Sequence, residues 1–236
     1  MARYATNDFH KINFAAVPHE STVYGPVTFA AVIFPSTART GDWRGVMAAT
    51  QSGGGVRMGM LLAPTTSALR FSTPGTEIDS TFTMLNADGW QIACIAKPSG
   101  SGNMRHSKYV FGTNTWTHET PGGTSDPPSV GAGGYFEVFH AGSDWYPGDI
   151  AAAAIWFREL GQSEVESLAR GRWDMLNPEF LVEFPMEGDP RNDTSFAWAR
   201  ESSRYQHPLI VGHEGLPRSL KTEPPGFRYS PVNRRQ

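Results

Sequence analysis

Short hydrophobic runs alternate with turn-forming residues between about Tyr24 and Gly171. The run Val27–Phe34 is rich in β-branched and aromatic residues and predicts a core strand that stops at Pro35. Similar runs predict strands at Trp43–Ala49, Val56–Leu62, Ala68–Ser72, Thr81–Leu85, Trp90–Ala96, Tyr109–Phe111, Thr115–His118, Tyr135–Phe139 and Ile150–Phe157. Turn signals between these runs recur about every 8–12 residues, which favours an antiparallel β-sandwich over alternating strands and helices.

One helix is predicted after the last of these strands. Ser163 and Glu166 form a capping-box pattern, which places a helix N-terminus there. Val165 and Leu168 then fall on one helical face, and Gly171 supplies the stop.

The chain changes character near Trp173. The segment 182–236 contains seven prolines and one short apolar run, so it cannot bury enough surface to fold alone. The predicted organisation is an N-terminal arm or edge strand over 1–20, a β-sandwich over 21–172 and an extended Pro-rich tail over 173–236. Spaced aromatic residues in the tail are predicted anchors for a partner, with wrapping of its own domain as the alternative: Phe184, Phe196, Trp198, Tyr205, Phe227 and Tyr229.

Composition narrows the class of protein. The 236 residues carry a net charge of −3, which gives no general reason to expect nucleic acid or an anionic membrane as partner. The start lacks an apolar signal-peptide core, and no stretch is long enough to span a membrane. The one cysteine, Cys94, lies in the predicted strand 90–96 and is expected to be a buried thiol, so folding in a reducing cytosol is expected.

Three stretches together carry a resemblance to a known superfamily. They are Val27–Ile33, then Gly89–Ala96 followed by Tyr109–Gly112, and lastly Gly148–Val165. In order and spacing they resemble the core strands, closing strand and terminal helix of concanavalin-A-like, laminin-G-like jelly-roll domains. The chain departs from that pattern at Phe111, where the family usually has an acid. The resemblance implies an all-β fold: a two-sheet antiparallel jelly-roll sandwich with one short C-terminal helix and an extended tail.

The segment Trp173–Val182 is similar to the region that follows this fold in tailed-bacteriophage virion proteins. This second likeness implies a non-enzymatic structural protein, such as a capsid decoration, minor capsid or minor tail protein. It would assemble in the host cytoplasm and dock through its tail onto other virion subunits, as a homo-oligomer or with capsid or tail proteins. The alternative is a lectin-like module that attaches to a host glycan.

Candidate ligand-binding residues follow from side-chain chemistry. Trp145, Tyr146 and Trp116, with Asn114, are aromatic and amide groups near predicted loops, where rings stack on sugars. No cofactor is required by the sequence, although relatives of the fold bind Ca²⁺ through loop carboxylates. Possible calcium ligands are Asp126, Asp144 and Asp149, but none has a dense acidic spacing.

Catalytic motifs are incomplete. The stretch Glu77–Phe82 resembles the Glu-x-Asp-x-x-Glu strand of glucanases, but Phe82 stands where the second glutamate is needed. The seven histidines show no i, i+4 pair, so a zinc site is not expected. The sequence therefore predicts that the protein is not an enzyme.

Overall fold

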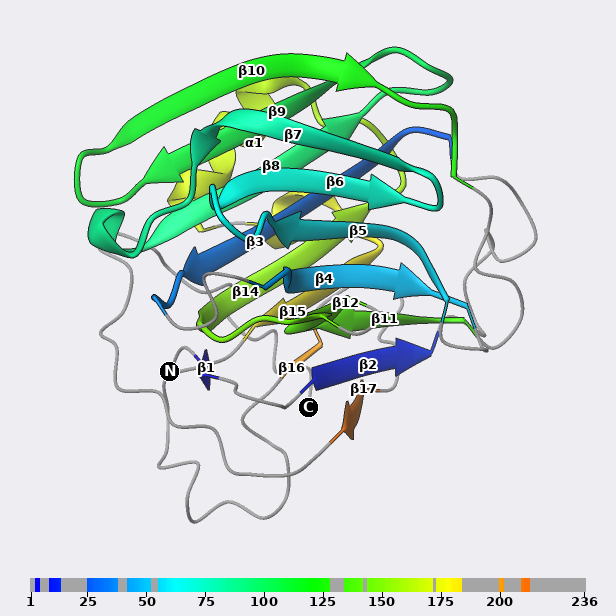
Figure 1. The fold of residues 1–236 in the computed structure, drawn as a ribbon, viewed down its shortest axis with the longest axis horizontal. Helices are drawn as coiled ribbons and strands as arrows, with labels where there is room; N and C mark the ends of the chain where they lie inside the picture. Colours follow the sequence, from blue (N-terminus) through cyan, green and yellow to red (C-terminus); the bar gives the residue numbers. More distant parts are fainter. Residues whose placement is uncertain are drawn as a thin grey trace.

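The structure is a computed structural model that describes residues 3–4, 9–13, 25–37, 42–51, 55–127, 134–141, 144–171, 173–183, 200–201 and 209–212. Within these ranges the fold is mostly β, with two large antiparallel sheets facing each other (Figure 1). None of the described helices is long and apolar enough to cross a membrane. The predicted all-β, two-sheet sandwich with one short helix is confirmed.

The first sheet, sheet A, contains the most buried strands of the fold. Its order is β10 (Thr115–Gly123), β9 (Asn103–Val110), β8 (Gln91–Lys97), β3 (Val27–Phe34), β14 (Asp149–Trp156), β15 (Phe180–Glu183) and β16 (Arg200–Glu201), with β1 (Arg3–Tyr4) also paired to β14. Every residue of β8 and β14 is buried, which explains why both read as continuous apolar runs instead of alternating ones.

The second sheet, sheet B, lies in front of sheet A in Figure 1. Its order is β17 (Leu209–Gly212), β2 (Phe9–Asn13), β11 (Tyr135–Val138), β4 (Arg44–Thr50), β5 (Val56–Leu62), β6 (Ala68–Thr73) and β7 (Thr76–Thr83). A small hairpin of β12 (His140–Ala141) and β13 (Asp144–Trp145) packs on β4. A Cβ at Gly45 would lie 2.3 Å from the Asp144 carbonyl oxygen, so this close approach requires glycine.

The main core lies between the two sheets. Phe29 of β3 meets Phe71 of β6 edge-to-face, with ring centroids 6.2 Å apart. Met47, Met58 and Met60 fill the space on the sheet B side and are fully buried. Packing therefore accounts for these methionines.

The outer face of sheet A is covered by α1 (Gln162–Ser167) and by the 3-10 turns η2 (Leu168–Arg170) and η3 (Trp173–Leu176). Trp156 of β14 packs against Trp173, with ring centroids 6.2 Å apart. Cys94 faces this second core and is fully buried, as predicted, and burial raises the pKa of its thiol to about 12.

The predicted start of the helix is wrong by two residues. The N-cap is Gly161, not Ser163, because the Glu164 carboxylate accepts a hydrogen bond from the Gly161 amide at 2.9 Å. Arg158 also donates to Glu164, and this hydrogen bond is the main reason that the pKa of Glu164 is lowered.

Several strand limits also differ from the prediction. Glu77 and Asp79 lie inside β7, which begins at Thr76, and β9 begins at Asn103, although both strands have polar starts. Sheet A continues beyond the predicted domain end at residue 172, because β15 pairs with Ala152–Ile155 and its residues 180–182 are buried. These segments are strands because they pair with a neighbouring strand. Their own composition does not predict them.

Strands of the predicted arm and tail lie together at the lower end of Figure 1. β2 and β17 extend sheet B, while β1 and β16 pair with β14 and β15 of sheet A. The described parts of the tail therefore pair with the chain's own domain.

The sheets are tied together where β7 and β10 form their edges. Glu119 of β10 accepts hydrogen bonds from the Thr81 amide and hydroxyl at 2.7 and 2.5 Å. Lys108 of β9 donates to the Thr83 carbonyl at 2.8 Å and to Asp88 at 2.7 Å. These contacts occupy polar groups that an unprotected edge strand would expose.

His106 lies on β9, next to the edge strand β10, and is fully buried. Its pKa is lowered from 6.5 to about 4, chiefly because burial disfavours the charged imidazolium. The charge of Asp79 opposes this shift, as does a backbone contact with Leu69 that falls short of a standard hydrogen bond.

We therefore expect the free energy of unfolding to fall as the pH drops from 6.5 to 4. The unfolded chain takes up a proton on His106 in that window and the folded chain does not, so His106 accounts for a loss of about 3 kcal/mol. Urea unfolding at several pH values measures this loss. His106→Leu should remove most of the slope, whereas His118→Gln, at a partly exposed histidine, should keep it. An unchanged slope in His106→Leu contradicts the assignment.

Candidate functional site

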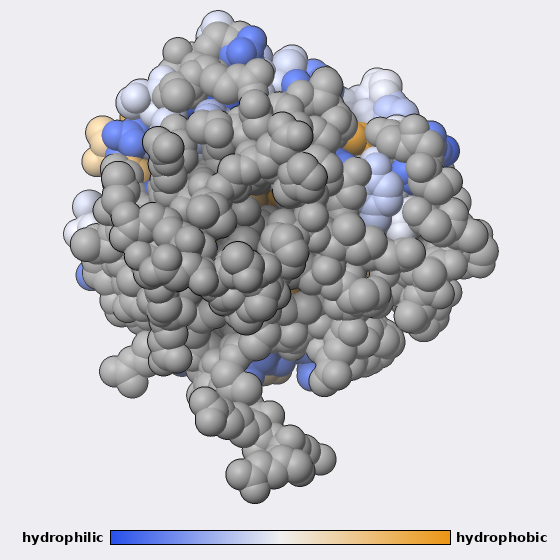
Figure 2. Space-filling model, turned by 90° about the horizontal axis from the view of Figure 1, so that it is seen from below, coloured by the Kyte–Doolittle hydropathy of each residue, from blue (hydrophilic) through white to orange (hydrophobic). Residues whose placement is uncertain are grey.

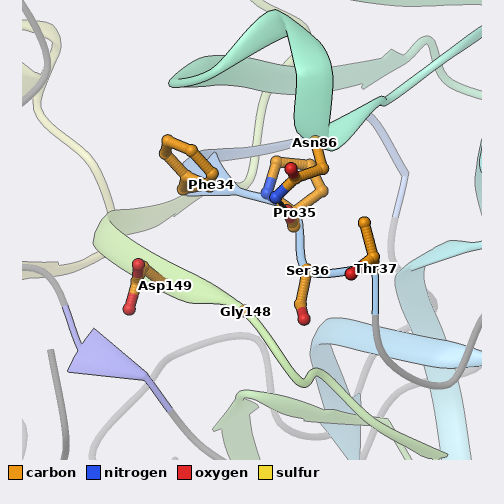
Figure 3. A pocket seen from close by; sticks show the side chains of 7 residues that line it. All are labelled: Phe34, Pro35, Ser36, Thr37, Asn86, Gly148 and Asp149. Carbon is orange, nitrogen blue, oxygen red and sulfur yellow. Dashed lines mark hydrogen bonds between the residues drawn. The ribbon is translucent and has the colours of Figure 1, made fainter. Parts of the chain in front are cut away.

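A pocket of about 240 Å³ opens at one rim of the sandwich, where three segments meet (Figure 3). We call it the rim pocket. The end of β3 with the residues after it, the 3-10 turn η1 (Asn86–Asp88) and the start of β14 supply its walls. The lining residues are Phe34, Pro35, Ser36, Thr37, Asn86, Gly148 and Asp149.

The local sequence explains why the pocket forms there. Pro35 ends β3, since proline cannot donate to a strand ladder. Phe34 and Asp149 are partners in the register of β3 and β14, so both strands reach the same rim. A Cβ at Gly148 would lie 2.6 Å from the Phe34 carbonyl oxygen, so glycine lets the two backbones approach at the pocket wall.

The lining combines polar and apolar groups. Asn86 donates its side-chain amide to the Pro35 carbonyl at 2.6 Å, which fixes the amide beside Pro35 (Figure 3). Thr37 brings an exposed hydroxyl, whereas Asp149 is 1% exposed and contributes to the wall of the pocket. Hydroxyl and amide groups around a small cavity suit a ligand rich in hydroxyl groups.

Sequence reasoning missed this site. The sequence predicts the end of a strand at Pro35, and Asp149 is named above as a possible calcium ligand, but neither residue is assigned to a common site. The residues come from positions more than a hundred apart, and the strand register alone brings them together. The turn-forming residues Asn86–Gly89 are the local sequence signal that marks one wall of the pocket.

The predicted sugar-binding residues do not form one site. Tyr146 is 1% exposed and packs in the core between the sheets, so the prediction that its ring is exposed is wrong. Burial raises the pKa of its hydroxyl well above the ordinary value. Trp145 belongs to β13, on the hairpin that packs on sheet B.

Trp116 lies on the outer face of sheet A instead. Its ring centroid is 5.0 Å from that of Tyr109 and 5.4 Å from that of His118, so it packs between neighbours. Asn114 accepts a hydrogen bond from the Tyr109 hydroxyl at 2.9 Å. Trp116 is half-buried, and Asn114 is exposed but already hydrogen-bonded, which makes this group a weaker candidate than the rim pocket.

The three predicted calcium ligands also lie apart. Across the described ranges, no three histidine, cysteine or acidic side chains form a group that could hold a metal ion. Asp144 is in β13 and Asp149 begins β14. Asp126 lies after β10, near the end of β8.

Asp126 is bound by a buried lysine. The Lys97 ammonium donates to Asp126 at 2.6 Å and to the carbonyls of Pro98 and Gly100, each at 2.9 Å. Burial alone would raise the pKa of Asp126, but hydrogen bonds from Lys97 and the Gly100 amide lower it overall. The ammonium occupies the oxygen-lined position that a cation would need.

The glucanase-like carboxylates are paired as well. Glu77 and Asp79 of β7 both form ion pairs with Arg70 of β6. The Arg70 guanidinium also lies 4.0 Å from the centre of the Trp43 ring. One guanidinium therefore binds both carboxylates and ties neighbouring strands together.

A serine, a histidine and a glutamate also meet on the outer face of sheet A. Ser107 lies 2.9 Å from Nδ1 of His118, and Glu166 of α1 lies 3.3 Å from its Nε2. This arrangement resembles the Ser-His-acid triad of hydrolases. Ser107 is fully buried, however, so a substrate cannot reach its hydroxyl. These contacts attach α1 to the sheet.

Figure 2 shows the molecule from below. The coloured part of this face is mostly hydrophilic, with small hydrophobic spots. The predicted tail anchors Phe184, Phe196, Trp198, Tyr205, Phe227 and Tyr229 lie outside the described residues.

Comparison with solved structures finds the β-sandwich fold of this chain in other proteins. A structure from Bacteroides ovatus ATCC 8483, described as a candidate carbohydrate-binding protein, is 13% identical with a TM-score of 0.52; the match covers 93% of this chain and 61% of that one. The chain thus spans less than two thirds of that protein, and the similarity shows the fold alone.

Two further structures are more distant. Tailspike protein 2 of Escherichia coli O157:H7 bacteriophage CAB120 is 14% identical over 69% of this chain and 23% of that one, with a TM-score of 0.45. The LG1-3 region of the laminin α2 chain is 12% identical over 65% and 30%, also with a TM-score of 0.45. No protein-family model and no curated protein matches the chain.

We expect Asp126→Asn to lower the free energy of unfolding by about 3 kcal/mol, because it leaves the Lys97 ammonium buried without a counter-charge. The double variant Lys97→Met with Asp126→Asn should recover much of that loss. Asp88→Asn, at the more exposed pair with Lys108, is the matched control and should cost less. A calcium-dependent rise in Tm that Asp126→Asn abolishes would instead make Asp126 a metal ligand.

Proposed function

We propose that the chain is a non-enzymatic carbohydrate-binding β-sandwich and that its ligand binds in the rim pocket. The observation that carries this proposal is the polar lining of that pocket. It combines hydroxyl and amide groups with the apolar edges of Phe34 and Pro35. Sugars present hydroxyl groups that donate and accept, together with apolar ring faces, so the two surfaces are complementary.

The fold supports the same class of function. The Bacteroides ovatus structure described as a candidate carbohydrate-binding protein aligns with nearly the whole chain. A catalytic role has less support, because Glu77 and Asp79 are both paired with Arg70 and Ser107 is buried. A binding protein needs a preformed polar pocket and no reactive group.

Glycan binding is tested by titrating the full chain with the glycans that bind it on an array. Asn86→Ala and Thr37→Val should each weaken binding about tenfold, because each removes a hydrogen-bonding group worth about 1.4 kcal/mol. Their matched controls are Asn103→Ala and Thr117→Val, at exposed positions on β9 and β10.

Three results would count against this assignment. If no glycan binds on the array or in the titration, the proposed function is wrong. If the pocket variants and their controls lose equal affinity for the glycan, the rim pocket is not the binding site. A loss confined to Trp116→Ala would move the site to the outer face of sheet A.

A second candidate is a structural role in a virus particle. It is supported by the likeness of the segment 173–182 to the region that follows this fold in phage virion proteins, and by the aromatic residues of the tail. In this role the tail would bind other virion subunits, as a homo-oligomer or with capsid or tail proteins. The pairing of β16 and β17 with the chain's own sheets favours instead a tail that wraps its own domain.

Analytical ultracentrifugation separates these two roles of the tail. If the tail binds other subunits, the full chain should assemble in a concentration-dependent way. Replacing Phe196, Trp198 and Tyr205 by alanine should then reduce assembly without lowering Tm. A monomer at every concentration, with a Tm that falls in the same variant, indicates a tail that packs only on its own domain.

A further inference from the structure

We propose that the seam between the edge strands β7 and β10 is an acid-sensitive latch, which is closed at neutral pH and opens locally in mildly acidic solution. The two strands lie side by side at the upper end of Figure 1. The residues of this β7–β10 seam are Thr81 and Thr83 on the sheet B side, and His106, Lys108 and Glu119 on the sheet A side. The inference does not depend on the proposed glycan site.

His106 is an unusual residue for the interior of a sandwich. Its side chain is fully buried, and neither ring nitrogen makes a hydrogen bond of standard geometry. Burying polar atoms without hydrogen bonds costs free energy, and an apolar side chain of similar size would avoid that cost. Packing therefore does not explain a histidine at this position, whereas a response to protons does.

Charged groups from neighbouring strands face His106. Glu119 of β10 is its partner in the strand register, so both side chains leave sheet A on the same face. Asp79 of β7 is close enough for its charge to act on the imidazole. Lys108 is two residues further along β9 and points to the same face. On the other side, the register partner in β8 is the apolar Ile95.

The charged groups of the seam already have other partners. The contacts are Glu119 with Thr81, Asp79 with Arg70, and Lys108 with Asp88. The two carboxylates therefore offset only part of the cost of a buried imidazolium. A proton on His106 is tolerated better when the seam opens and water reaches the ring.

The strands of the seam are suited to local opening. The one buried residue of β7 is Ser80, and β10 has no buried residue. By contrast, every residue of β8 and β14 is buried. Regions with little buried surface open at a lower free energy than the core, so the seam separates while the core strands stay paired. Opening uncovers Ile78 and Phe82, which pack on the main core from β7.

Acid favours the open form because that form binds a proton more tightly. In a hydrated, open seam the pKa of His106 returns to its ordinary 6.5, whereas burial lowers the pKa to about 4 in the closed seam. The closed form therefore binds fewer protons, and opening is increasingly favoured as the pH falls from 6.5 to about 4. About pH 5 lies roughly 1.5 pH units below the pKa of the open form, which favours opening about thirtyfold relative to neutral pH.

Native-state hydrogen exchange of the full chain, measured by mass spectrometry at low urea concentrations, tests the latch. Exchange rates are divided by the intrinsic rates at each pH, so that they report opening alone. We expect the opening constant of amides in β7 and β10 to rise about thirtyfold between about pH 7.5 and about pH 5. Local opening exposes little surface, so these rates should be nearly independent of urea, whereas those of β8 and β14 should rise with it.

Three variants assign the response to His106. His106→Leu fills the position without a titratable group and should reduce the rise to less than about threefold. His118→Gln is the matched control, because it removes a histidine from the outer face of the same sheet, and it should keep the rise. Glu119→Gln retains an oxygen that accepts from Thr81 and should also keep it.

The pH at which the rise begins is a second measurement, and it needs no variant. A response of His106 begins below about pH 6.5 and amounts to about tenfold per pH unit, whereas carboxyl groups of ordinary pKa would act only below about pH 5. The inference is overturned by no rise, by a rise that begins only below about pH 5, or by an equal rise in His106→Leu. Exchange of β7 and β10 with the same urea dependence as β8 and β14 also overturns it, since acid then acts on the whole fold.

Discussion

The burial of sheet A on both faces is the constraint on which the rest of the structure depends. β14 has no exposed residue, so it needs cover on each side. Sheet B covers one face with Phe71 and its methionine-rich strands. The short helix and the 3-10 turns cover the other, where Trp173 packs on Trp156. The alanines of β14 are consistent with this double cover, because small side chains let both layers approach closely.

The rim pocket follows from the same arrangement. β3 and β14 are paired along their lengths, so their ends are fixed relative to each other. Pro35 ends one strand, Gly148 permits the close approach of the other, and Asn86 is bonded to the Pro35 carbonyl. A pocket built on the ends of buried strands is preorganised, which reduces the entropy that a ligand must lose on binding.

Most groups that suggest chemistry in the sequence have structural roles in the described part of the fold. Lys97 and Asp126 tie two loops together, Arg70 joins Glu77 to Asp79, and Ser107 is buried under the cover of sheet A. Among the described residues, the rim pocket keeps polar groups such as the Thr37 hydroxyl accessible. These structural roles are consistent with the binding function proposed above, whose site lies at the strand ends and not at the predicted aromatic residues.

The sequence by itself determined the architecture wherever burial is uniform. Strands such as Val27–Phe34 carry their own apolar signal, and the antiparallel sandwich, the single helix and the buried Cys94 follow from such patterns. Only the tertiary structure decided the polar beginnings of β7 and β9, because β6 and β10 pair with them whatever their hydrophobicity. It also decided that Tyr146 is buried and that Asn86 and Asp149 line one pocket. Those relations depend on strand register between distant segments, which local periodicity does not encode.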